Sequence, residues 1–323
     1  MKADWVSKTL IVACLAMLSQ TACSINRPSS ADAPAGCPMW AQETVPEWVR
    51  PHLARAGLPE SFPKDAKLGG ETTGIDLWQA NHFVAYNKDT ARYLYSKYTP
   101  TSVTYRRGTL PTCERIVAEY TLGCKTDREK AMALLNRAMS KVTVHPSIPP
   151  YGPMVRPDRG ADEEALLKNG DLWCNEQARV FVRLCQVAGV PARIVFLFLS
   201  EGKNGHVIAE FYADHHWCMA DASYGCAFPD ETGRLMSAAD CHANQASKLQ
   251  AGKGYIQRLQ EVLTWSDEQL VGARYIQISD PQERARQTAE GAERARDGLR
   301  KRTAEKMGYQ FWAFGVMNYP LPP

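Results

Sequence analysis

The apolar positions of this chain follow a helical period in some stretches and a strand period in others. Over residues 127–142 they recur every three or four positions, so that Ala131, Leu134, Leu135 and Met139 would share one face of a helix. An apolar face of this kind has to be buried against another element. We therefore predict a helix here that packs on the core of the protein.

A second helix is predicted over residues 174–188, where the text CNEQARVFVRLCQVA carries an apolar stripe. Cys174 falls in its first turn, and Gly189 together with Pro191 would end it. Asp171 or a neighbouring residue would cap its start.

Three runs typical of β-strands follow this helix. Residues 192–200 form a continuous apolar run, which suits a buried strand, whereas residues 206–213 and 216–223 are shorter alternating runs. One helix followed by three consecutive strands predicts an α+β fold in which an antiparallel sheet is backed by that helix.

Helical spacing recurs on both sides of this region. It is present over residues 74–98, and again over residues 237–249 and 255–263. Residues 283–306 alternate in charge and have few large apolar side chains, which is typical of a solvated helix held by pairs of opposite charge. We expect residues 309–323, which are rich in aromatic side chains, to dock back on the body of the protein.

Residues 1–23 have the layout of a secretory signal, with lysines before an apolar stretch that is short for a permanent membrane span. They also resemble a bacterial lipoprotein signal, in which the cysteine after the cleavage site is lipidated. Cys23 lies at the right distance, although Gln20 stands where that signal normally has Leu; Cys14 fits the short motif but has hardly any apolar stretch before it. We expect export to the cell envelope or periplasm and a membrane lipid anchor at Cys23. Cleavage near this position without lipidation is the alternative.

Charge argues against one class of partner. Lysine and arginine outnumber aspartate and glutamate by only 38 to 35, which leaves no broad basic surface of the kind that nucleic-acid binding needs. We therefore expect no nucleic-acid partner.

The chain has ten cysteines, and export would allow them to pair. With the cysteines of the signal, the lipid site and the helix start set aside, an odd number remains, and Cys185 in its apolar helical run is the best candidate for a free thiol. The others could form up to three disulfides, with Cys113–Cys124 as a plausible local pair. A zinc site is a less favoured alternative, because no two cysteines have the short spacing of a structural site. Its ligands would come from His215, His216, Cys218, Cys226, Cys241 and His242.

Cys174, His206 and Asp221 are the candidate reactive residues. A helix start favours the thiolate form of a cysteine, which is the nucleophilic form. A hairpin turn centred between Ala213 and Asp214 would place His206 directly opposite Asp221, with Cβ atoms about 4.5–5.5 Å apart. The carboxylate could then orient the imidazole and leave its other nitrogen for the thiol. Taken singly, each residue has a plainer interpretation, as a core thiol, a surface histidine and a turn acid.

The stretch from about residue 127 to residue 225 resembles the transglutaminase-like superfamily. The matching text is CNEQARVFVRLCQVAGVPARIV from Cys174, GHVIAEF from Gly205, with Glu210 four residues after His206, and WCMAD from Trp217. The resemblance covers roughly a third of the chain and implies a papain-like core with a Cys, His, Asp set in this order.

By this resemblance, Cys174 would be the nucleophile, His206 the base and then the acid, and Asp221 the orienting carboxylate. The chain departs from the common pattern at Leu172, where Gly is frequent two residues before the cysteine. Backbone N–H groups at the helix start, including that of Cys174, could still form the oxyanion hole. Trp173 could wall the acyl pocket, or it could belong to the core.

The resemblance implies a cysteine enzyme that acts on amide bonds of a protein or peptide substrate through an acyl-thioester, as a peptidase, an amidase or an acyltransferase. It implies no metal and no cofactor. The alternative is a catalytically silent protein of the same fold that binds or scaffolds in the cell envelope.

These patterns divide the chain into five expected segments. They are a signal peptide of the lipoprotein type (1–23), a flexible linker (24–39), a helical N-terminal part of the domain (40–160), a transglutaminase-like catalytic core (161–228) and a helical C-terminal extension (229–323).

Overall fold

The structure is a computed structural model of the chain. It describes residues 84–86, 90–95, 101–143, 162–169, 172–198, 206–271, 278–311 and 313–319. The expected signal peptide, its lipidation site at Cys23, the linker and Asp171 lie outside the described residues.

The centre of the protein is a six-stranded antiparallel sheet with the strand order β1-β6-β2-β3-β4-β5. The three predicted strands are present as the consecutive neighbours β2, β3 and β4, which confirms the predicted α+β arrangement. The strands β1, β5 and β6 were not predicted; β1 lies within residues 74–98 and β6 in the C-terminal segment, both of which we expected to be helical. The bounds are β1 Val84–Ala85, β2 Ala192–Phe198, β3 His206–Ala213, β4 His216–Asp221, β5 Cys226–Ala227 and β6 Ala313–Asn318.

The register between β3 and β4 differs from the predicted one by two positions. Asp214 and His215 form the turn, and both have a positive φ, of 50° and 64°, as a two-residue hairpin turn of type I′ requires. Ala213 therefore pairs with His216 across the hairpin, and Asp221 is a diagonal rather than a direct neighbour of His206. Because side chains alternate with a period of two, this shift keeps His206 and Asp221 on one face.

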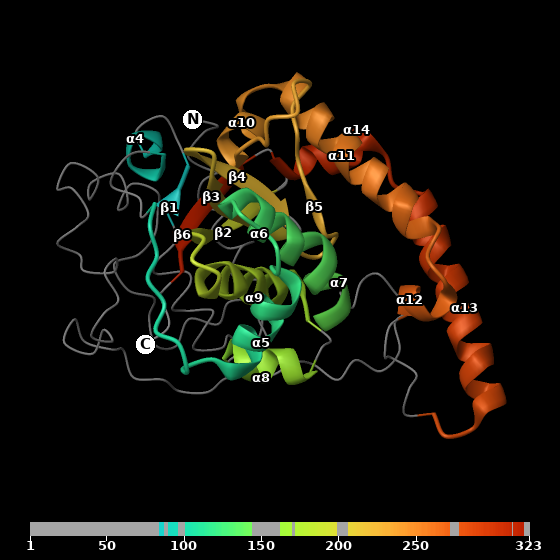
Figure 1. Cartoon of the computed structure of the whole chain (residues 1–323). Coiled ribbons are helices and arrows are strands. Elements are labelled where there is room, and N and C mark those ends of the chain that lie inside the picture. Colours follow the sequence, from blue (N-terminus) through green and yellow to red (C-terminus); the bar gives the residue numbers. More distant parts are fainter. Residues whose placement is uncertain are drawn as a thin grey trace, which may run out of the picture.

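One face of the sheet is covered by helices that precede β2 in the chain, as Figure 1 shows. The predicted helix over residues 127–142 is present, with a π-helical segment in its middle, and its four predicted face residues are buried. The helix α9 packs on β2 and β3. The bounds are α5 Pro111–Tyr120, α6 Asp127–Ala133, η2 Leu134–Ala138, α7 Met139–Val142, α8 Glu163–Asn169 and α9 Cys174–Val187.

The opposite face is covered mainly by the C-terminal helices, together with the short α4 (Ala91–Leu94) (Figure 1). Alternation along β2 shows the two sides directly, because Ile194 and Phe196 belong to one apolar cluster and Val195 and Leu197 to the other. The sheet is thus the middle of three layers, whereas the sequence predicted a helical backing on one side. The bounds are α10 Ala238–Ala243, α11 Gln245–Leu263, α12 Asp267–Val271, α13 Pro281–Arg300, α14 Ala304–Gly308 and the 3₁₀ turn η4 Tyr309–Phe311.

Two glycines let α14 lie directly on α11. A Cβ atom on Gly252 would collide with the backbone of Ala304, and one on Gly308 would come within 2.6 Å of the Lys248 carbonyl oxygen. Such close backbone approach is available only to glycine. It anchors α11, which contributes to the candidate site described below.

A buried ion pair joins β2 to β3. Arg193 and Glu210 are register partners, both side chains are fully buried, and Arg193 Nη2 lies 2.6 Å from Glu210 Oε2. Glu210 also accepts hydrogen bonds from the Tyr95 hydroxyl at 2.8 Å and from the Ala238 N–H at 2.7 Å. The ring of Trp217 stacks on the Arg193 guanidinium at 3.9 Å. Three residues of the text that resembles the superfamily therefore hold the sheet and its neighbours together.

A second buried network fixes α9. The carboxylate of Glu163 accepts hydrogen bonds from Arg179 Nη2 at 3.0 Å, from Arg183 Nε at 2.9 Å and from the Tyr319 hydroxyl at 2.6 Å. Because Tyr319 follows β6, this network joins α8, α9 and the C-terminal segment, and it keeps the start of α9 in a fixed position relative to the sheet.

The predicted disulfides are not formed among the described cysteines, which are all free thiols. Cys113 lies in the first turn of α5 and Cys124 beyond its last turn, and a ten-residue helix is about 15 Å long. A disulfide needs Cα atoms within about 7 Å. The proposed local pair is therefore wrong, while Cys185 is buried and free as expected.

Two further searches cover the described part of the chain. It contains no group of three or more histidine, cysteine or acidic side chains placed to hold a metal ion. None of its helices is both long and apolar enough to cross a membrane.

Candidate active site

Cys174 is the first residue of α9. Trp173 occupies the N-cap position with an extended backbone, and its side chain makes no capping hydrogen bond. The segment before Cys174 is held by Gln177, whose Nε2 donates to the Leu172 carbonyl oxygen at 3.1 Å. The first-turn N–H groups of a helix have no acceptor within the helix. The Cys174 sulfur is thus placed at a helix N-terminus, next to the positive end of the helix dipole.

His206 lies between Cys174 and Asp221. Its Nε2 is 2.6 Å from Asp221 Oδ2, and the Cys174 side chain lies close enough to the same ring to interact with it electrostatically. Since Nε2 faces the carboxylate, Nδ1 is the nitrogen left for the sulfur. The side chain of His206 is 12% exposed and that of Asp221 is fully buried. The structure therefore brings together the three residues that the sequence singled out.

Asp221 accepts four hydrogen bonds. Oδ2 receives His206 Nε2 and the Tyr255 hydroxyl, each at 2.6 Å. Oδ1 receives the backbone N–H groups of Ser223 at 2.9 Å and Tyr224 at 3.2 Å. A carboxylate has about four acceptor positions, and here all of them are used. This environment suits the ionised form although the group is buried.

The electrostatics of the pair follow from this geometry. Burial by itself raises the pKa of Asp221, but the positive charge of His206 and the hydrogen bonds hold it below its ordinary value. Burial likewise lowers the pKa of His206, but the charge of Asp221 and hydrogen bonds with Asp221 and Cys174 raise it from 6.5 to about 10. His206 is therefore protonated at neutral pH and carries a positive charge next to the sulfur.

Residues 114–222 match the family model of the transglutaminase-like superfamily. This part of the chain is a transglutaminase-like domain. Its α+β core and the order of Cys174, His206 and Asp221 agree with the resemblance seen in the sequence. The fold is thus that of a group of cysteine enzymes.

A solved structure is also similar to the chain. It is a candidate cysteine protease from Cytophaga hutchinsonii, with 13% sequence identity, a TM-score of 0.30 and coverage of 43% of each chain. No curated protein matches the sequence.

Two aromatic residues of the site lie beyond the matched transglutaminase-like domain. The Tyr224 ring meets the His206 ring edge to face, with centroids 5.9 Å apart, and the Tyr255 ring meets Tyr224 at 5.3 Å. Tyr255 belongs to α11 on the second face of the sheet, whereas Cys174 belongs to α9 on the first. The site therefore forms where the two helical layers meet. Sequence reasoning missed both tyrosines, because no local pattern links them to Asp221.

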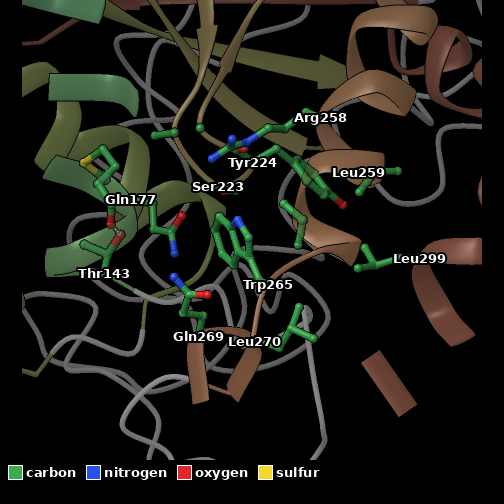
Figure 2. Close-up of a pocket in the computed structure, with 14 residues that line it drawn as sticks. Thr143, Gln177, Ser223, Tyr224, Arg258, Leu259, Trp265, Gln269, Leu270 and Leu299 are labelled. Atoms are coloured by element: carbon green, nitrogen blue, oxygen red, sulfur yellow. Dashed lines mark hydrogen bonds between the residues drawn. The ribbon is translucent and has the colours of Figure 1, made fainter. Parts of the chain in front are cut away.

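A cavity of about 50 Å³ is lined by sequence neighbours of Cys174 and Asp221, although neither of these two residues lines it. Gln177 lies one turn after Cys174, and Ser223 and Tyr224 follow Asp221. Figure 2 shows the Gln177 side chain pointing toward Trp265, with Arg258 and Tyr224 on a neighbouring wall. Both layers contribute to the lining, which consists of Met139, Thr143, Gln177, Ala222, Ser223, Tyr224, Gly225, Arg258, Leu259, Val262, Trp265, Gln269, Leu270 and Leu299.

Trp173 is half-buried and is not among the residues that line this cavity. Its predicted contribution to an acyl pocket or an oxyanion hole stays a prediction. Leu172, which replaces the glycine frequent in the family, is fully buried in the first core, and its carbonyl oxygen is the acceptor that Gln177 uses.

Proposed function

We propose that this protein is a cysteine enzyme that cleaves amide bonds with Cys174, His206 and Asp221. The observation that carries the proposal is the position of His206, which joins a buried, fully hydrogen-bonded carboxylate to a thiol at a helix N-terminus. A structural cysteine would not need a protonated imidazole beside it, whereas an activated thiol does.

In the proposed reaction the Cys174 thiolate attacks the carbonyl carbon of an amide. The carbonyl oxygen takes up negative charge, which in this scheme the backbone N–H groups at the start of α9 stabilise. His206 then gives its proton to the leaving nitrogen, the C–N bond breaks, and an acyl-thioester remains on Cys174. Neutral His206 next removes a proton from water or an amine, which attacks the thioester and releases the thiolate.

Asp221 acts through His206 in this scheme. It holds the imidazole by Nε2, which leaves Nδ1 for the sulfur, and its charge stabilises the imidazolium. The Tyr255 hydroxyl and two backbone N–H groups fix the carboxylate in turn. We infer that Tyr255 is a positioning residue, although it lies outside the matched domain.

Incubation of the protein with unmodified casein and a fluorescent primary amine tests this proposal. Release of ammonia would indicate an amidase, and new amino termini would indicate a peptidase. Incorporation of the amine into casein would indicate acyl transfer. We expect at least one of these activities from the wild type and none from Cys174→Ala. Cys185→Ala is the matched control, because this thiol lies on the same helix but is buried away from His206. If the wild type and Cys174→Ala are equally inactive, the alternative of a catalytically silent binding protein is favoured.

We also propose that the protein is exported and anchored in the cell envelope through a lipid on Cys23. The support is the sequence of residues 1–23 alone, with its lysines, short apolar stretch and small residues around the cysteine. A peptide or protein of the envelope would then be the substrate.

A further inference from the structure

The cavity beside the candidate site contains two buried polar atoms that are unpaired within the described part of the chain. They are Gln177 Oε1 and Ser223 Oγ. Gln177 is only 1% exposed, so its carbonyl oxygen is shielded from bulk water outside the cavity. Buried polar atoms are almost always hydrogen-bonded, and one that is not has a cost in stability. Two of them on one small cavity, one of them a single helical turn from Cys174, point to a binding role.

The direction of the Gln177 amide is fixed by its other half. Its Nε2 donates to the Leu172 carbonyl oxygen, which only a nitrogen can do, so Oε1 is the atom left without a partner. Gln177 therefore offers an acceptor. Ser223 Oγ offers a hydroxyl, which can donate as well as accept.

The charge of the cavity argues against a cationic ligand. Arg258 is part of the lining, and its guanidinium also lies over the Trp265 ring at 5.4 Å. Its Nε donates to the Tyr224 carbonyl oxygen at 2.8 Å, and its Nη1 pairs with Glu261 at 2.8 Å. Two of the three Arg258 nitrogens are thus engaged and Glu261 balances its charge, so an acidic ligand would gain little from it. An uncharged group fits best.

The size and the remaining walls narrow the ligand further. A cavity needs about 10–15 Å³ on this measure to hold one water molecule, so a cavity of about 50 Å³ accepts a group of only a few non-hydrogen atoms. Much of the remaining wall is apolar and includes Leu259, Val262 and Leu270. A hydroxyl on a short carbon stem would donate to Gln177 Oε1, accept from Ser223 and place its carbons on the apolar wall.

We propose that this cavity is the specificity pocket of the site and takes a short hydroxyl-bearing side chain, of the threonine or serine kind, from the substrate residue that is acylated onto Cys174. The inference rests on the proposed function, because it assigns a substrate class to the same thiol. Gln177 Oε1 accepts a hydrogen bond from this hydroxyl, whereas an isosteric apolar side chain leaves Oε1 unpaired.

Two matched reagents test the pocket, N-acetyl-threonyl and N-acetyl-valyl chloromethyl ketone. The threonyl reagent carries a hydroxyl where the valyl reagent carries a methyl group. In each, the Cys174 thiolate attacks the chloromethyl carbon, an S–C bond forms, and the C–Cl bond breaks as chloride leaves. Labelling of the peptide that contains Cys174 is followed by mass spectrometry. We expect the threonyl reagent to react about tenfold faster with the wild type, as one hydrogen bond to a buried polar group predicts.

Variants connect the preference to the cavity. Each rate is divided by the rate of the same variant with iodoacetamide, which has no side chain to fill the pocket, so that a general disturbance of the thiol cancels. In Gln177→Leu we expect the preference to disappear or to reverse. In Val262→Phe, which fills the cavity from α11 without touching the segment before Cys174, we expect both normalised rates to fall.

The outcomes separate the two proposals. If iodoacetamide labels Cys174 at pH 6.5 but the two ketones react equally, or the valyl reagent is faster, the pocket assignment is overturned and the proposed function stands. The same holds if Gln177→Leu keeps the wild-type preference. If iodoacetamide does not label Cys174 at this pH, the proposed function fails and the pocket assignment falls with it.

Discussion

The hydroxyl of Tyr255 donates a hydrogen bond to Asp221 Oδ2 at 2.6 Å, although 34 residues separate the two in the chain. Asp221 ends β4 inside the transglutaminase-like domain, and Tyr255 lies in α11 beyond it. The C-terminal helices therefore do more than cover the sheet. They complete the environment of the carboxylate that holds His206.

Removing this hydroxyl should weaken the site without unfolding it. We expect Tyr255→Phe to lose about 1.5–3 kcal/mol of stability and to reduce kcat/KM for an amide substrate by about tenfold, because one hydrogen bond to a charged buried group is lost. The pH profile of Cys174 alkylation, measured in parallel, should also change, since Asp221 orients His206.

The control is Tyr255→Leu, which removes the ring as well and should cost several kcal/mol more by leaving space in the core. A positioning role is contradicted if Tyr255→Phe loses stability but keeps both the wild-type kcat/KM and the wild-type pH profile.

The charge of His206 makes stability depend on pH. Folding raises its pKa from 6.5 to about 10, so the folded protein holds this proton more tightly than the unfolded chain. The contribution of the protonated His206 to the free energy of unfolding is therefore fully present below about pH 6.5. It is lost as the pH rises toward 10. Urea unfolding of the wild type and His206→Gln at pH 6, 8 and 10 should show a free-energy difference that shrinks with pH. A difference that stays constant or grows would contradict the assigned charge state.

The Arg193–Glu210 pair should dominate the stability of the sheet. We expect Glu210→Gln to cost about 3–5 kcal/mol, because it leaves the buried Arg193 guanidinium without a countercharge. Glu290→Gln on α13 is the matched control, since its pair with Arg286 is exposed and should be worth less than about 1 kcal/mol. Chemical denaturation of both variants measures the contrast, and similar losses in the two would refute it.

Lipidation at Cys23 makes a separate prediction. In a bacterial host, a fatty acid carrying an alkyne tag should be incorporated into the full-length wild type and should be absent from Cys23→Ser. Cys14→Ser is the control and should keep the label. Labelling that survives Cys23→Ser, or export without any label, would favour ordinary cleavage of the signal.

The local pattern of the sequence was enough to predict the parts of the fold that depend on neighbouring residues. The helix that starts at Cys174 and the strands β2, β3 and β4 follow from the period of the apolar positions. The predicted register was wrong by two residues, because alternation does not fix which residues form the turn, and Asp214 and His215 adopt the positive φ that a two-residue turn needs. The prediction that His206 contacts Asp221 is still confirmed, because a shift of two residues keeps both side chains on the same face of the sheet.

Other parts were not accessible to this reasoning. The strand β6 enters the sheet from the far end of the chain, and Tyr255 reaches Asp221 across the layers, so neither has a local signature. The cavity depends on side chains from both helical layers, which only the folded chain brings together. Gln177 carried a faint signal, since it lies one turn after Cys174 on the same predicted helix.

The most direct test of the account is the rate of Cys174 alkylation by iodoacetamide between pH 5 and 9, compared in the wild type and His206→Gln. Cys185 and Cys218 are internal references, because burial raises the pKa of both thiols, that of Cys218 to about 12. We predict that Cys174 reacts well at pH 6 while these two do not, and that in His206→Gln its reaction at pH 6 falls at least tenfold and recovers only near about pH 8.5, where an ordinary thiol ionises. A Cys174 that is inert at pH 6, or that reacts equally in the two proteins, would contradict the central claim that His206 activates it.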